Sequence, residues 1–311
     1  MTRILITGAS GMIGHALLDL LGKTSHDIIA TDLRAPALPT AARFLPMDVT
    51  GSDPERVITQ TRPDVIVHLA SIVTPSAGAS RDLAHAVDVT GTRNVLRAAC
   101  ANGVRRLVVT SSGAAYGYHA DNPVPLRETD ALRGNPEFAY ADHKRQVEEM
   151  LAQARQSHPS LEQVVLRVGT VLGADTNNQI TALFHKPRLL AVRGCDSPFV
   201  FIWTQDLAHI LLRACTDGPP GIFNVAGDGS LGIDDLARSL NKPVLRLPAT
   251  ALKAALAIAK PLGLTRYGPE QVRFLQYRPV LANERLKSDF GYTPQLDSAQ
   301  VFDLWRRQAG L

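Results

Sequence analysis

The chain has few cysteines and no long apolar run. Its 311 residues include three cysteines, Cys100, Cys195 and Cys215, which are widely spaced and odd in number. Such spacing gives no metal-ligand pattern and suits reduced thiols in a cytoplasm, so we expect no bound metal. No apolar stretch reaches the roughly 18 residues of a membrane span, and the longest candidate, 249–259, is interrupted by Lys253. The start, M-T-R-I-L-I-T-G, has no apolar leader followed by a small-residue cleavage site, so we expect a cytoplasmic protein.

The chain also lacks a large excess of charge of one sign. Lysine and arginine number 33 against 29 aspartates and glutamates, a formal net charge of +4, and the basic residues are scattered. We therefore expect neither a nucleic-acid nor a membrane partner. The composition is that of an ordinary globular protein, without a clear internal repeat or low-complexity stretch. A chain of this length can bury a substantial core as one large domain or two unequal ones.

A glycine-rich turn near the start of the chain predicts a dinucleotide site. The short apolar run R-I-L-I-T at 3–7 is followed at once by G-A-S-G-M-I-G and then by a helical pattern of leucines. In such a turn Gly8 allows the tight bend, Gly11 lets the backbone approach a pyrophosphate, and Gly14 lets the helix pack closely on the strand. N–H groups at the start of the helix then face the phosphates. The predicted cofactor loop comprises Gly8, Ser10, Gly11, Met12, Ile13 and Gly14.

The end of the second predicted strand, D-I-I-A-T-D, bears on the choice between NAD and NADP. It ends at Asp32, close to the spacing of about 20 residues expected for an acid that holds the adenosine ribose hydroxyls. Arg34 lies two residues further on, and an arginine there could instead accommodate the 2′-phosphate of NADP. Because a carboxylate at position 32 would repel that phosphate, we prefer NAD and keep NADP as the alternative.

Strands and helices alternate regularly through the first half of the chain. A short strand at 43–48 precedes the apolar run P-D-V-I-V-H-L-A-S, a long helix at 83–102 and another apolar run, R-R-L-V-V-T-S-S. Continuous apolar runs are typical of strands buried on both faces. The alternation therefore predicts an α/β fold built on a Rossmann-type, doubly wound parallel sheet.

The second half of the chain is less regular. Loop composition with one short helix fills 174–198, and helical pieces broken by prolines fill 233–311. We expect a dinucleotide-binding domain over 1–173, to which 199–229 returns, and a smaller, mostly helical substrate-binding region over 174–311. In folds of this kind ligands bind at the carboxyl ends of the strands, so this region is expected to lie over them.

Tyr140 and Lys144 lie four residues apart in Y-A-D-H-K, within a helix predicted at 137–156. Positions i and i+4 share one face of a helix, so the phenol and the ammonium would lie side by side. A phenol has an ordinary pKa near 10, so acting as a base near neutral pH needs a shift of roughly 3 units, or about 4 kcal/mol. A nearby ammonium supplies much of this. Since such a pair also occurs by chance, its meaning depends on the glycine turn.

Taken in order, the glycine turn, H-L-A-S, T-S-S-G-A-A-Y-G and Y-A-D-H-K resemble an extended short-chain dehydrogenase/reductase, of the group called the NAD-dependent epimerase/dehydratase family. The resemblance covers almost the whole chain and is specific through about residue 173. It implies that Ser112 orients the substrate oxygen and that Tyr140 exchanges a proton as hydride passes between substrate and nicotinamide. It implies that Lys144 favours the phenolate and holds the nicotinamide ribose. Further implied cofactor positions are Asp48, Val49, Leu69, Ala70, Ser71 and Thr110, and His68 is more simply a packed strand residue.

Three positions depart from the family's pattern. Asp88, in D-V-T-G-T, takes the place of an asparagine and leaves open the hydrogen bonds of this position on the cofactor side. Phe199 stands where sugar-nucleotide epimerases carry an arginine that grips the substrate pyrophosphate, and Thr170 replaces an asparagine that touches the nucleotide-sugar. These two changes remove a charge-assisted bond of roughly 1.5 to 3 kcal/mol and a neutral one of about 1 kcal/mol.

Phe199, Phe201 and Trp203 form an alternating aromatic set, so on a strand they would share one face. We expect Phe199 and Trp203, with Thr170 and Ser112, to line an apolar substrate pocket. Core packing is an equal alternative for Phe201 and Trp203.

The leading hypothesis is an NAD(P)-dependent oxidoreductase that transfers hydride between nicotinamide and a secondary alcohol or ketone of a non-nucleotide, apolar substrate. The alternative is a nucleotide-sugar 4-epimerase or dehydratase, in which the same residues make a transient ketone without net use of cofactor. A remote third hypothesis is a non-catalytic NAD(P)-binding sensor. Besides a small-molecule substrate, the family resemblance implies a second copy of the chain as partner, in a homodimer formed through the helices at 83–102 and 137–156.

Overall fold

A parallel sheet forms the centre of the protein, whose computed structural model describes residues 1–37, 39–73, 81–174, 176–265 and 267–311. The seven strands follow the order β10-β6-β5-β4-β1-β2-β3, and every neighbouring pair is parallel. They are β1 (Arg3–Thr7), β2 (Asp27–Asp32), β3 (Arg43–Pro46), β4 (Val65–His68), β5 (Arg106–Ser112), β6 (Glu162–Val168) and β10 (Gly221–Val225). The predicted doubly wound α/β fold is confirmed.

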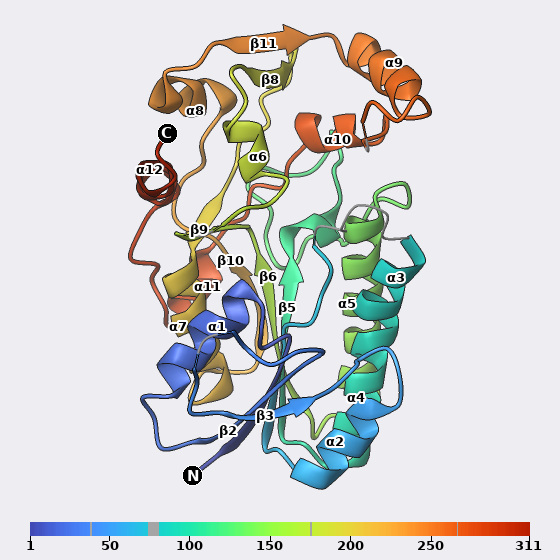
Figure 1. Ribbon diagram of the computed structural model, residues 1–311, viewed down its shortest axis with the longest axis vertical. Helices are drawn as coiled ribbons and strands as arrows, with labels where there is room; N and C mark the ends of the chain where they lie inside the picture. Colours follow the sequence, from blue (N-terminus) through green and yellow to red (C-terminus); the bar gives the residue numbers. More distant parts are fainter. Residues whose placement is uncertain (38, 74–80, 175, 266) are drawn as a thin grey trace.

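Helices cover both faces of this sheet (Figure 1). One face packs against α1 (Met12–Leu21), α7 (Thr204–Cys215) and α11 (Glu284–Ser288), and the other against α2 (Asp53–Thr61), α4 (Gly91–Ala101) and α5 (Ala139–Ser157). Side chains of each strand alternate between the two cores: Ile4 and Ile6 of β1 lie in the first, and Leu5 lies in the second. Because both faces are covered, the strands are apolar throughout, which is why the sequence shows them clearly.

The helix predicted over 83–102 consists of three consecutive segments. They are α3 (Arg81–His85), a π-helical segment (Ala86–Thr90) and α4. A π turn is rare and often occurs at a functional site, because it widens the helix by one residue and redirects side chains. Here it holds Asp88, whose side chain is fully buried.

A second region lies over the carboxyl ends of the strands (Figure 1). It contains α6 (Thr181–Phe184), β8 (Leu189–Val192), α8 (Ile233–Leu240), β11 (Val244–Leu247), α9 (Ala249–Ala259), α10 (Gln271–Gln276) and α12 (Ser298–Gln308), and β7 (Thr170–Leu172) pairs with β9 (Phe201–Trp203) beside it. The sequence patterns predict a loop and helices where β8 and β11 pair in parallel. Each of these strands has four residues, too few for a periodic signal, and its partner is distant in the chain.

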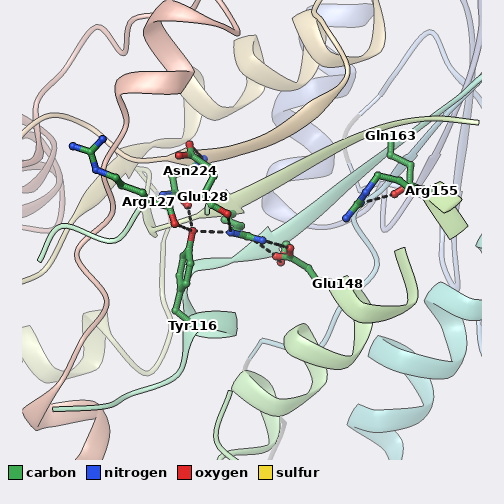
Figure 2. A network of polar contacts seen from close by, with 9 residues as sticks. Tyr116, Arg127, Glu128, Glu148, Arg155, Gln163 and Asn224 are labelled. Atoms are coloured by element: carbon green, nitrogen blue, oxygen red, sulfur yellow. Dashed lines mark hydrogen bonds and ion pairs between the residues drawn. The ribbon is translucent and has the colours of Figure 1, made fainter. Parts of the chain in front are cut away.

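A buried ion pair joins β6 to the helix that carries Tyr140. Arg167 donates to both carboxylate oxygens of Glu148, with Nη2–Oε2 at 2.7 Å and Nε–Oε1 at 3.0 Å, and the two side chains are 4% and 3% exposed. Ser111 donates to the same carboxylate at 2.5 Å, and Arg167 donates to the Tyr116 hydroxyl at 2.8 Å. That hydroxyl lies 2.8 Å from Oδ1 of Asn224 (Figure 2). The network therefore links β5, α5, β6 and β10 at the end of the sheet where ligands bind in this fold.

Removing one partner of this buried ion pair should lower the free energy of unfolding far more than removing one partner of an exposed ion pair. Arg167→Met leaves the Glu148 carboxylate buried without a counter-ion, so we expect the free energy of unfolding to fall by about 3 to 5 kcal/mol. Arg105→Gln, which breaks a pair with Glu162 at 48% and 38% exposure, is the control. It should change stability by less than about 1 kcal/mol. Urea unfolding followed by circular dichroism measures both, and equal losses would refute the structural role given to Arg167.

Candidate active site

A cavity of about 500 Å³ lies between the carboxyl ends of β1, β4, β5 and β6 and the helices α9 and α10. Many residues that the sequence predicts for the site line it, namely Gly8, Gly11, Met12, Ile13, Gly14, Leu69, Ser71, Thr110, Ser112, Tyr140, Lys144, Thr170 and Phe199. The fold thus brings the glycine turn, the strand ends and the Y-A-D-H-K helix to one cavity.

The glycine turn has the shape that a close backbone approach requires. Gly8 has φ +68°, and a Cβ there would lie 2.7 Å from the backbone nitrogen of Ala70. At Gly14 a Cβ would lie 2.5 Å from the carbonyl oxygen of Gly8, whereas at Gly11 that oxygen, the nearest neighbour, is 3.4 Å away. Helix α1 begins without a side-chain hydrogen bond at its cap. The open side at Gly11 and the uncapped helix start fit a dinucleotide pyrophosphate.

Six predicted cofactor residues lie outside the cavity lining. Asp32 is at the glycine turn, where its Oδ2 accepts from the backbone nitrogen of Ser10 at 3.0 Å. Ser10 in turn donates from its hydroxyl to the carbonyl oxygen of Arg34 at 2.6 Å. Asp48 accepts from the nitrogen and the hydroxyl of Thr50 at 2.9 and 2.7 Å, within its own turn. The remaining two are Val49, which is buried, and Ala70, whose nitrogen donates to Thr7 at 3.2 Å.

Ser112, Tyr140 and Lys144 face the cavity together. The Lys144 Nζ lies 5.6 Å from the centre of the Tyr140 ring and donates to the carbonyl oxygen of Thr110 at 3.1 Å. The Ser112 hydroxyl oxygen accepts from the backbone nitrogen of Ala114 at 3.1 Å, which leaves its own proton available to a ligand. This arrangement can exchange a proton with a bound alcohol or ketone and hold its oxygen.

His68 lies beneath the cavity and does not line it. Its Nδ1 is 2.7 Å from the hydroxyl of Thr7, and its Nε2 is 2.9 Å from that of Thr92. Burial, with a smaller effect of the Lys144 charge, lowers the pKa of His68 to about 3. The ring is therefore neutral at physiological pH and acts as a packed, hydrogen-bonded strand residue.

Arg278 lines the cavity, and no sequence pattern pointed to it. Its guanidinium carbon lies 3.8 Å from the ring centre of Phe199 and 4.9 Å from that of Phe274. One nitrogen donates to the carbonyl oxygen of Ser197, and Nε is buried without a hydrogen-bond partner. Burial lowers the pKa of Arg278 to about 9, so it keeps its charge at neutral pH. Within the ranges that the structure describes, no acidic side chain forms an ion pair with it.

Trp203 does not line the cavity, which corrects its predicted place in the substrate pocket. Phe199, Phe201 and Trp203 do share a hydrophobic cluster, but that cluster is the core beneath α12, where Phe201 stacks on Phe302 at 5.6 Å. Phe199 stacks on Phe201 at 5.5 Å and also reaches the cavity. The physical reason is that one face of a strand packed beneath a helix is filled with core side chains.

Comparison with known proteins identifies the family. The model of the NAD dependent epimerase/dehydratase family matches residues 4–226. The chain belongs to this family. A UDP-glucose 4-epimerase of Mycolicibacterium smegmatis is 28% identical over 96% of this chain and 95% of its own length. An uncharacterised protein of Mycobacterium tuberculosis is 25% identical over 99% of this chain and 84% of its own.

Solved structures of similar proteins have the same fold. The UDP-glucose 4-epimerase of Thermotoga maritima, solved with UDP-glucose, has a TM-score of 0.78 at 19% identity and covers 99% of this chain and 98% of its own. The UDP-glucose 4-epimerase of Thermus thermophilus, solved with NAD, has a TM-score of 0.73 at 22% identity and covers 98% of each chain. Among the described residues of this family member, no helix is long and apolar enough to cross a membrane. The homodimer stays a prediction.

The depressed pKa of His68 gives the stability a specific dependence on pH. The unfolded histidine takes up a proton near pH 6.5, its ordinary value, whereas the folded one does so near 3. The buried neutral ring therefore contributes fully above pH 6.5 and loses its contribution as the pH falls toward 3, at about 1.4 kcal/mol per pH unit. Compared with His68→Asn, the wild-type protein should lose its stability advantage over this window.

Urea unfolding at pH 7.5, 6.5, 5.5 and 4.5 measures this difference, since the other titrating groups are common to both proteins. His158→Gln, at an exposed histidine, is the control and should follow the wild-type curve. Parallel curves for the wild type and His68→Asn would show that His68 is not a buried neutral ring.

Proposed function

We propose that the protein is a nucleotide-sugar 4-epimerase or dehydratase that uses NAD to oxidise a secondary alcohol and reduce the ketone again. The observation that carries the proposal is Arg278, a half-buried cation in the same cavity as Tyr140, whose Nε is buried without a hydrogen-bond partner and which has no acidic partner in the described part of the chain. A buried charge is costly unless it is paired, so the cavity is suited to an anionic substrate. The pyrophosphate of a nucleotide sugar has this chemistry.

The cofactor assignment rests on the glycine turn and on Asp32. The uncapped start of α1 and the open side of Gly11 suit a pyrophosphate, and the carboxylate beside the turn suits ribose hydroxyls better than a 2′-phosphate. NAD, when bound, accepts the hydride and returns it. Tyr140 takes the proton of the substrate hydroxyl, Ser112 donates a hydrogen bond to the same oxygen, and the Lys144 ammonium stabilises the phenolate.

Phe199, which argues against a nucleotide sugar in the sequence, has a different role in the structure. Its ring is one of the two that hold the Arg278 guanidinium, at 3.8 Å. The aromatic face stabilises the cation without neutralising it. The absence of an arginine at position 199 therefore does not leave the cavity without a positive charge.

A second candidate function is a dehydrogenase or ketoreductase that acts on a less polar, non-nucleotide substrate. The apolar part of the cavity favours it, because Leu190, Leu252, Leu256 and Phe274 line the side beneath α9 and α10. The same catalytic residues serve both functions. The two differ in whether reduced cofactor accumulates.

Tyr140→Phe should abolish most of the turnover. We expect the wild type with NAD to convert a nucleotide sugar without a rise in NADH absorbance. Chromatography of the sugar nucleotides measures the conversion. Removing the phenolic proton donor should lower kcat roughly 10²- to 10⁴-fold. Tyr277→Phe, at a tyrosine outside the cavity, is the control and should retain activity. Accumulation of NADH with neutral secondary alcohols alone would favour the second function, and NADH binding without any turnover would favour a sensor.

Arg278→Met should separate an anionic substrate from a neutral one. The methionine keeps an apolar side chain between the two rings but removes the charge, so we expect KM for a nucleotide sugar to rise roughly 10- to 100-fold with a smaller change in kcat. Arg273→Met is the matched control, because Arg273 pairs with Glu137 at 3.0 Å and lies outside this cavity. An unchanged KM in Arg278→Met would contradict the proposed substrate class.

A further inference from the structure

Asp88 is a buried carboxylate beside the helix that carries Tyr140 and Lys144. Its Oδ1 accepts from the hydroxyl of Ser71 at 2.8 Å and from the backbone nitrogen of Ile72 at 2.9 Å. Its Oδ2 lies 3.2 Å from Nδ1 of His143, and the Asp88 and His143 side chains are 0% and 1% exposed. The carboxylate therefore joins the turn after β4 to helix α5.

The electrostatic surroundings keep this carboxylate charged. Burial raises the pKa of Asp88, but the hydrogen bond from His143, the charge of Lys144 and the donors of residues 71–72 outweigh it and leave the pKa below its ordinary value. The two buried acids on α5 have other partners. Asp142 accepts from Arg145 at 2.9 Å and from Gln146 at 2.8 Å, and Glu148 is paired with Arg167 at 2.7 Å. The positive charge of Lys144 therefore favours the ionised form of Asp88.

The side chains at positions 88 and 143 are a matched hydrogen-bond acceptor and donor. An asparagine at 88, as in the family's pattern, could still accept from residues 71–72 through its oxygen. Its amide nitrogen, however, would face Nδ1 of His143, and it would offer no charge to Lys144. The carboxylate accepts from the imidazole instead, and the His143 ring is held edge-on by the ring of His85 at 5.3 Å. The π-helical segment directs Asp88 to this point.

We propose that Asp88 and His143 form a positioning pair. The pair ties the cavity-lining turn at Ser71 to helix α5, and so sets where Tyr140 and Lys144 stand relative to the cofactor side of the cavity. Asp88 also balances the Lys144 charge. Neither residue takes part in proton or hydride transfer. The link from this pair to cofactor binding rests on the proposed function, whereas the pair itself does not.

NADH binding to four variants, followed by fluorescence, tests the positioning. Asp88→Asn removes the charge and His143→Leu removes the donor, and each should weaken binding roughly tenfold. The double variant should bind NADH no more weakly than the single variant with the lower affinity, because each single change already breaks the hydrogen bond between positions 88 and 143. His143→Asn keeps a donor at the place of Nδ1 and should stay within about threefold of the wild type. Simple addition of the two single effects overturns the proposal.

His158→Leu supplies the matched control, because His158 is an exposed histidine at the other end of α5. Combined with Asp88→Asn, its effect should add. Spectra of protein labelled with ¹⁵N-histidine test the pair without cofactor: the Nδ1 proton of His143 should give a carboxylate-bonded signal that is lost in Asp88→Asn and retained in His158→Leu. A signal that persists in Asp88→Asn refutes the pair. A wild type that binds no NADH refutes the proposed function, and the spectra still decide the pair.

Discussion

The buried ion pair between Glu148 and Arg167 is the interaction on which the site's geometry depends. Removing two charges from water costs several kcal/mol each, and this cost is offset only when every donor and acceptor is satisfied. Ser111 and Tyr116 complete the network, and Asn224 extends it to the edge strand β10. Because these hydrogen bonds form only when the donors and acceptors are correctly placed, the network holds β5, β6 and α5 in one arrangement. Ser112, Tyr140 and Lys144 stand on these elements.

Charge in the cavity is arranged on largely apolar walls. Lys144 and Arg278 supply the cations, and neither lies in an ordinary surface ion pair. Where water is excluded, each charge acts more strongly than it would at the surface. One cation lies near the Tyr140 ring and the other lies against the rings of Phe199 and Phe274, an arrangement that suits the anionic substrate proposed above. The leucines of α9 that line the cavity could contact an apolar part of the substrate.

The glycine turn and the helix that carries Tyr140 could be predicted closely because their signals are local. The turn at Gly8, Gly11 and Gly14 lies within one strand–turn–helix unit, and Tyr140 and Lys144 are one helical turn apart. The substrate side could not be predicted in the same way. Trp203 alternates with Phe199 like a pocket residue, yet packing beneath α12 places it in the core. The pairing of β8 with β11 has no local signal at all.

By itself, the sequence determined the parallel sheet, the glycine turn and the helix that carries Tyr140 and Lys144, since hydrophobic period, glycine conformation and helical spacing act over a few residues. Only the tertiary structure decided which charges are buried and what faces them. Asp88 and His143 come from different helices, and Arg278 reaches the cavity from a segment more than a hundred residues beyond Tyr140. The effect of a charge depends on its burial and its neighbours, and these are set by the folding of the whole chain.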